Sequence, residues 1–175
     1  MNAVVVYESM FGNTKDIAFA IADGLASGLD VRCFEVGTAP HVFDHPDLLV
    51  VGGPTHAFSM SRSSTRDSAK TETEELLISE TGIRDWIDDV EVSRGQSFAT
   101  FDTKVPRPKL PGSAAASASK RLKRHHGSSI AKPETFWVTG MTGPLIDGEI
   151  ERATIWGKDL SALVSKAGTD RSKRA

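Results

Sequence analysis

The chain has 175 residues with a formal net charge of −2 at pH 7, and 39% of its residues are hydrophobic. This composition is typical of one globular domain, and the near-neutral charge provides no overall field that would attract nucleic acid or an anionic membrane. We therefore expect neither as a partner. Cys33 is the only cysteine, which excludes a disulfide within the chain and a CxxC motif.

The first half of the chain alternates between strand patterns and a helical pattern. Ala3–Tyr7 is an apolar run rich in valine, as expected for a strand that is buried on both faces. Apolar residues then recur at helical spacing over Ile17–Leu25, and two further strands are predicted at Val31–Val36 and Asp47–Gly52. The hydrophilic segment Ser61–Glu80 has no such pattern and is predicted to be a long loop.

The second half continues this alternation. A short helix is predicted at Gly82–Val90, a strand at Ser97–Phe101 and a helix at Ser113–His126. The last strand is predicted at Thr135–Thr139. The final helical pattern covers Ile150–Val164.

Alternating strands and helices predict βαβ units with right-handed crossovers, and hence a parallel sheet. Five strands fit an α/β doubly wound sheet of order 2-1-3-4-5, in which ligands bind beyond the carboxyl ends of the strands. We expect a single domain over residues 1–167, with Asp147 as the N-cap of the last helix, and a disordered basic tail at residues 168–175. The sequence has no signal-peptide pattern and no apolar run of about 20 residues, so it predicts a cytoplasmic protein.

The loop Ser9–Thr14 follows the first strand and precedes the first helix. Backbone N–H groups at a helix start are unpaired, and the helix dipole adds partial positive charge, so this place suits a phosphate. Ser9 and Thr14 can donate from their hydroxyls, while Gly12 lets the backbone come close and Asn13 tolerates unusual dihedral angles. The loop lacks the lysine of GxxxxGK[ST], which favours a phosphate monoester over a nucleoside triphosphate. A plain helix cap is the alternative.

Two further loops should lie at the same edge of the sheet. Gly52–Arg62 follows the third strand and offers backbone donors and an aromatic side chain, Phe58, where a planar ring could lie. Phe101–Gly112 follows the fourth strand, contains three prolines and places Asp102 and Thr103 at the strand end. The three loops together predict a ligand site at this edge.

At this point the sequence resembles a known family. The pattern S-x-F-G-N-T at residues 9–14 is similar to the phosphate loop of flavodoxins, usually T/S-x-T-G-x-T, and Gly52–Arg62 and Thr139–Leu160 resemble segments of flavodoxin-like proteins. The resemblance covers about residues 2–165. It implies a flavodoxin-like three-layer αβα sandwich that binds flavin mononucleotide (FMN).

The resemblance also implies which residues contact FMN. The phosphate would be held by Ser9, Met10, Phe11, Gly12, Asn13 and Thr14. The loops that would flank the isoalloxazine ring supply Pro54, Thr55, His56, Ala57 and Phe58 on one side and Phe101, Asp102, Thr103 and Lys104 on the other. No metal site is expected.

The chain departs from the usual flavodoxin pattern in two ways. Phe11 stands where the phosphate loop normally has a threonine, and the third loop has no aromatic residue after Phe101. The resemblance implies an FMN-binding redox protein that carries electrons between protein partners. An FMN-dependent NAD(P)H:quinone-type oxidoreductase with a small-molecule electron acceptor is one alternative, and a non-redox module that binds a phosphate ligand is the other.

Overall fold

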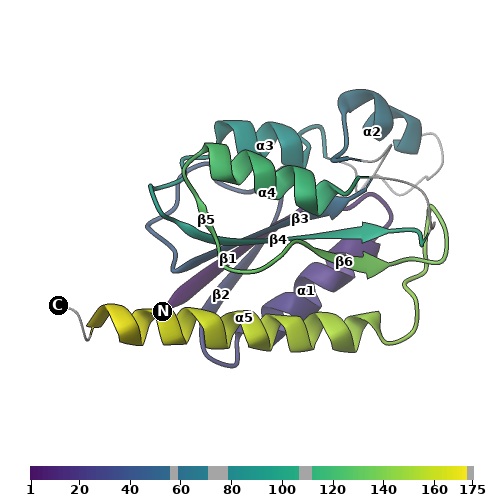
Figure 1. The fold of residues 1–175 in the computed structure, drawn as a ribbon. Coiled ribbons are helices and arrows are strands. Elements are labelled where there is room, and N and C mark those ends of the chain that lie inside the picture. Colours follow the sequence, from purple (N-terminus) through teal and green to yellow (C-terminus); the bar gives the residue numbers. More distant parts are fainter. Residues whose placement is uncertain (56–58, 71–78, 107–111, 173–175) are drawn as a thin grey trace.

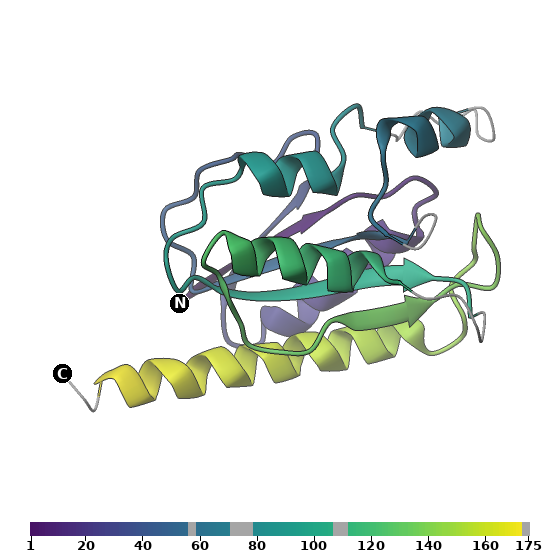
Figure 2. The ribbon, with the colours of Figure 1, turned by 45° about the horizontal axis from the view of Figure 1, so that its top comes forward.

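The computed structural model describes residues 1–55, 59–70, 79–106 and 112–172. It has three layers, with a central sheet between two layers of helices (Figure 1). Both ends of the described chain lie at the edge of the sheet where the strands begin, and α2 lies at the opposite edge (Figures 1 and 2). None of the helices among the described residues is long and apolar enough to cross a membrane.

The sheet is parallel and runs in the order β2-β1-β3-β4-β5, and β6 also pairs with β4. Its strands are β1 (Asn2–Tyr7), β2 (Asp30–Glu35), β3 (Leu48–Pro54), β4 (Ser97–Lys104), β5 (Ser128–Ser129) and β6 (Glu134–Trp137). The predicted α/β class and strand order are therefore confirmed.

The fifth position of the sheet differs from the prediction, because two separate segments occupy it. β5 pairs with the start of β4, at Ser97 and Phe98, whereas β6 pairs with the end of β4, from Phe101 to Lys104. The strand predicted at Thr135–Thr139 corresponds to β6. The two serines of β5 carry no strand pattern, which is why the sequence predicts one strand here rather than two.

Helices cover both faces of the sheet. They are α1 (Asn13–Leu25), α2 (Ser63–Lys70), α3 (Ile83–Asp89), α4 (Ala114–Arg124) and α5 (Glu149–Ser172). α1 and α5 lie on one face and α3 and α4 on the other (Figure 2). Successive side chains of β1 point to opposite faces of the sheet and pack in both cores. Val5 packs in the core on the α1–α5 face, and Val4 and Val6 pack in the core on the α3–α4 face.

The backbones of α1 and α5 are in close contact. A Cβ atom added to Gly24 would lie 2.2 Å from the carbonyl oxygen of Thr154, and one added to Gly157 would lie 2.3 Å from the carbonyl oxygen of Ile21. Only glycine fits at either position without moving a helix. This contact fixes α1 and α5 side by side on the same face of the sheet.

Three other expectations differ from the structure. α2 lies within the segment that was predicted to be a loop. Asp147 is not the N-cap of the last helix, because α5 begins at Glu149 and its first hydrogen bond runs from the Arg152 N–H to the Gly148 carbonyl, 3.0 Å apart. α5 also continues to Ser172, past the end of the helical pattern predicted over Ile150–Val164.

Candidate functional site

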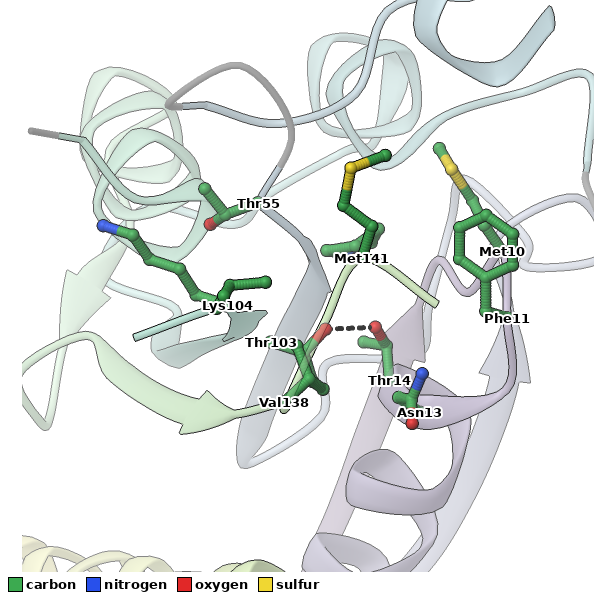
Figure 3. A pocket seen from close by; sticks show the side chains of 11 residues that line it. Met10, Phe11, Asn13, Thr14, Thr55, Thr103, Lys104, Val138 and Met141 are labelled. Atoms are coloured by element: carbon green, nitrogen blue, oxygen red, sulfur yellow. Dashed lines mark hydrogen bonds between the residues drawn. The ribbon is translucent and has the colours of Figure 1, made fainter. Parts of the chain in front are cut away.

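A pocket opens at the carboxyl edge of the sheet, between the segments that follow four strands (Figure 3). Its lining consists of Met10, Phe11, Asn13 and Thr14 after β1, Pro54 and Thr55 at the end of β3, Thr103, Lys104 and Val105 at the end of β4, and Val138 and Met141 after β6. The topology explains this grouping, because β1, β3, β4 and β6 are neighbours and all end at the same edge.

Two hydroxyl groups form the floor of the pocket. The Oγ1 atoms of Thr14 and Thr103 lie 2.7 Å apart, and both side chains are buried. The Thr55 N–H donates to the Thr103 carbonyl at 2.9 Å, which joins the ends of β3 and β4. One of the two hydroxyls donates its O–H to the other oxygen, so the O–H of the second hydroxyl remains available to a ligand.

The start of α1 has no side-chain cap. Gly12, its N-cap residue, has a φ of 86°, and a Cβ at this position would meet nothing within 4 Å. By contrast, Ser113 accepts from the Ala116 N–H at the start of α4, and Glu8 accepts from the Ile83 N–H at the start of α3. The first N–H groups of α1 therefore face the loop without the side-chain oxygen that caps the other two helices.

The Ser9 hydroxyl supplies a second observation at the same place. Ser9 is 6% exposed, and its Oγ is buried with no hydrogen-bond partner among the described residues. A buried polar group without a partner is costly unless a ligand or water satisfies it. Together with the uncapped helix start, it favours an anion that accepts hydrogen bonds at the Ser9–Thr14 loop.

A buried carboxylate directly precedes this loop. Glu8 is 2% exposed, its Oε2 accepts from the Ile83 N–H at 2.8 Å, and its Oε1 accepts from the Ser61 hydroxyl. Arg66 of α2 donates to the same Ser61 oxygen at 3.3 Å and pairs with Asp85 of α3 at 3.1 Å. Burial raises the pKa of Glu8, although these hydrogen bonds and the Arg66 charge act in the opposite direction. The cluster joins the end of β1 to α2 and α3.

The comparison with protein-family models identifies the family of this chain. The flavodoxin family model matches residues 5–130, which is more than half of the sequence. The chain belongs to the flavodoxin family. Members of this family typically bind FMN.

Solved flavodoxin structures share the fold. A flavodoxin from the domain Archaea is 18% identical, with a TM-score of 0.67 over 94% of this chain and 99% of the other. Oxidised flavodoxin 1 from Bacillus cereus is 16% identical, with a TM-score of 0.67 over 95% and 98% of the two chains. A flavodoxin from Streptococcus pneumoniae is 20% identical, with a TM-score of 0.65 over 93% and 99%. A search of curated proteins finds no match.

The features of this flavodoxin site fit the phosphate of FMN. Three sets of neutral donors lie in or beside the Ser9–Thr14 loop, namely the buried Ser9 hydroxyl, the Thr14–Thr103 hydroxyl pair and the uncapped start of α1. The open space around Gly12 leaves the backbone accessible. Phe11 lines the pocket, and the Thr103 hydroxyl from β4 lies beside that of Thr14 at its floor.

The structure separates the residues predicted to flank the flavin ring. Thr103 and Lys104 line the pocket, together with Pro54 and Thr55. The side chain of Phe101 instead lies in the core on the α1–α5 face, where its ring centroid is 6.4 Å from that of Phe136. The predicted residues His56, Ala57 and Phe58 lie outside the described residues.

Asp102 has a structural role at the start of α4. Its buried Oδ2 accepts from the hydroxyls of Thr55 at 2.7 Å and Ser113 at 2.6 Å, and from the Ala115 N–H at 3.0 Å. The Thr55 hydroxyl oxygen accepts in turn from the Ala114 N–H at 2.8 Å. The Asp102 side chain therefore fixes Thr55 and α4 and does not line the pocket.

Sequence reasoning did not identify three residues that line the pocket: Val105, Val138 and Met141. The last two belong to a fourth loop, after β6. The predicted strand order placed the fifth strand beside the fourth, so its carboxyl end could have been included with the other three loops.

Proposed function

We propose that the chain binds FMN at this pocket and carries electrons between redox partner proteins. The observation that carries the proposal is the uncapped start of α1, preceded in the same loop by a buried Ser9 hydroxyl that has no partner among the described residues. Family membership supports FMN as the ligand. The bound cofactor would supply the electron-transfer chemistry, and the protein would bind and orient it.

The chain's own groups divide the work at the phosphate. Ser9 and the free O–H of the Thr14–Thr103 pair donate hydrogen bonds, and the first N–H groups of α1 add the favourable end of the helix dipole. These donors are neutral, so the phosphate keeps its charge without a paired lysine or arginine from the loop. The ends of β3 and β4, which line the pocket through Thr55 and Lys104, would flank the ring.

One substitution tests the phosphate site. Thr14→Val keeps the shape of the side chain and removes the hydroxyl, so we expect the Kd for FMN to rise about 10- to 100-fold, as for the loss of a hydrogen bond to a charged group. Quenching of flavin fluorescence measures the Kd. Thr38→Val is the matched control, because Thr38 is exposed in the turn after β2 and donates only to the Glu35 carbonyl among the contacts described.

The ligand comparison is as informative as the variant. Riboflavin, which lacks the phosphate, should bind far more weakly than FMN, and Thr14→Val should not change its affinity. An unchanged FMN affinity in Thr14→Val would remove this hydroxyl from the site. A wild-type protein that neither contains nor binds FMN would overturn the proposed function.

A further inference from the structure

We propose that the turn after β6, residues 139–144, forms a fourth wall of the cofactor site and that Met141 contacts the flavin ring. This inference rests on the proposed binding of FMN. Figure 3 shows Met141 between the Thr55–Lys104 side of the pocket and the Met10–Phe11 side. It is the residue of this turn that lines the pocket.

The turn is held in shape by its own hydrogen bonds. The Thr139 N–H donates to the Pro144 carbonyl at 2.8 Å, and the Gly143 N–H donates to the Gly140 carbonyl at 3.2 Å. At its base, Val138 and Leu145 form an antiparallel bridge. Met141 is thus carried at the tip of a closed hairpin-like turn.

The turn is also attached to the phosphate loop. The Asn13 side-chain amide donates to the Thr142 carbonyl at 2.9 Å. Gly143 packs so closely on the same side chain that an added Cβ would lie 2.4 Å from Asn13 Oδ1. Since Asn13 is the first residue of α1, a ligand that contacts the start of this helix also lies next to the turn.

Met141 is an exposed apolar side chain that also lines the pocket, so it is free to cover a ligand bound there. Met141 is 65% exposed, whereas Met10 and Met60 are 3% and 1% exposed. A flexible, polarisable thioether makes favourable contacts with aromatic rings, and a large apolar side chain beside a pocket is suited to cover a planar ligand. The third loop has no aromatic residue between Phe101 and Gly112, so Met141 supplies an apolar wall from a different strand.

Oxidation of the methionines tests this contact directly. Hydrogen peroxide transfers one oxygen atom to an exposed thioether, giving the sulfoxide and water, and mass spectrometry measures the extent at each methionine. Saturating FMN should slow the oxidation of Met141 about threefold or more, because burial protects the sulfur. Met1 is the internal control, since it is 53% exposed and lies near Gly168 at the far end of α5.

Substitution gives a second measurement. Met141→Ala should raise the Kd for FMN about two- to tenfold through the loss of the side-chain contact with the ring, and Met141→Leu, which keeps an apolar side chain of similar size, should restore most of the affinity. Val42→Ala is the matched control, because Val42 is 61% exposed and does not line the pocket. The exposed tip position makes these variants compatible with folding.

The outcomes separate this inference from the proposed function. If FMN binds and Met141 oxidises as fast as without FMN, Met141 does not contact the flavin and the inference is overturned while FMN binding stands. If FMN does not bind the wild-type protein at all, both are overturned. Protection of Met141 with unchanged oxidation of Met1, together with weaker binding in Met141→Ala, supports the fourth wall.

Discussion

Removing the Asp102 carboxylate should destabilise the whole domain. Asp102 is 0% exposed, and three donors converge on its Oδ2 atom: the hydroxyls of Thr55 and Ser113 and the Ala115 N–H. In Asp102→Ala the two hydroxyls can rotate toward other acceptors. The Ala115 N–H cannot, because it is fixed in the first turn of α4 and Ala115 is itself fully buried.

The magnitude follows from these contacts. A hydrogen bond to a charged group contributes about 1.5–3 kcal/mol to stability. The desolvation of the buried carboxylate offsets part of what the three hydrogen bonds contribute together. We therefore expect Asp102→Ala to lower the free energy of unfolding by about 3 kcal/mol. For a domain of this size, that corresponds to a fall in Tm of about 6–12 °C. Asp102→Asn keeps one acceptor oxygen and should cost about half as much.

Urea unfolding, followed by far-UV circular dichroism and tryptophan fluorescence, measures the change. Asp88→Ala is the control, because Asp88 is 46% exposed and its ion pair with Arg121 lies at the surface, where a pair contributes about 0–1 kcal/mol. A loss of less than about 1 kcal/mol in the free energy of unfolding of Asp102→Ala would be below the range expected for a buried hydrogen-bond network. That result would refute the capping role of Asp102.

Two further predictions concern buried or bridging charges. Because burial raises the pKa of Glu8 above its ordinary value of 4.5, the folded state holds this proton more tightly than the unfolded state, so stability should fall as pH rises from about 4.5 through the raised pKa. Urea unfolding across this range should show that Glu8→Gln removes this part of the slope, and an identical slope in both proteins would contradict the argument. Arg152 contacts Glu134 and Glu149 and lies 4.3 Å from the centroid of the Phe136 ring, so Arg152→Ala should cost about 1–2 kcal/mol, allowing for its partial exposure. Urea unfolding at low and at high salt measures the loss of stability. Arg152→Lys should recover only part of this loss, and a loss in Arg152→Ala that does not change with salt would exclude the ion pairs as its cause.

The elements that were predicted well are those whose burial shows in the residue pattern. The valine-rich β1 and the apolar start of β3 are covered on both faces, so their sequences are almost free of polar residues. α2 was missed because SSTRDSAK has no apolar stripe. Its buried anchor is Arg66, which is held by polar contacts to Ser61, Asp85 and the Glu80 carbonyl. Such polar contacts follow no periodic pattern in the sequence.

The candidate site shows the same limit at single-residue level. The resemblance to flavodoxins places residues 101–104 together beside the flavin, but side chains alternate along a strand. Phe101 and Thr103 therefore face the α1–α5 side, one in the core and the other at the pocket floor, while Asp102 turns toward α4. Applying the two-residue period at the strand end would have separated these roles. The attachment of the turn at residues 139–144 to Asn13 depends on tertiary packing, so no local sequence pattern predicts it.

The divided fifth position of the sheet has a consequence for how copies of the chain meet. An outer strand normally presents a row of unpaired backbone groups on which a strand from another molecule can add. Here β6 offers four residues and β5 only two, and between them stand Lys132 and Pro133, both exposed. Proline has no N–H to donate, and lysine places a solvated charge on the boundary. A strand from another molecule could therefore form backbone hydrogen bonds along only one short segment. This limits strand addition, and hence aggregation, at the β5–β6 edge of the sheet.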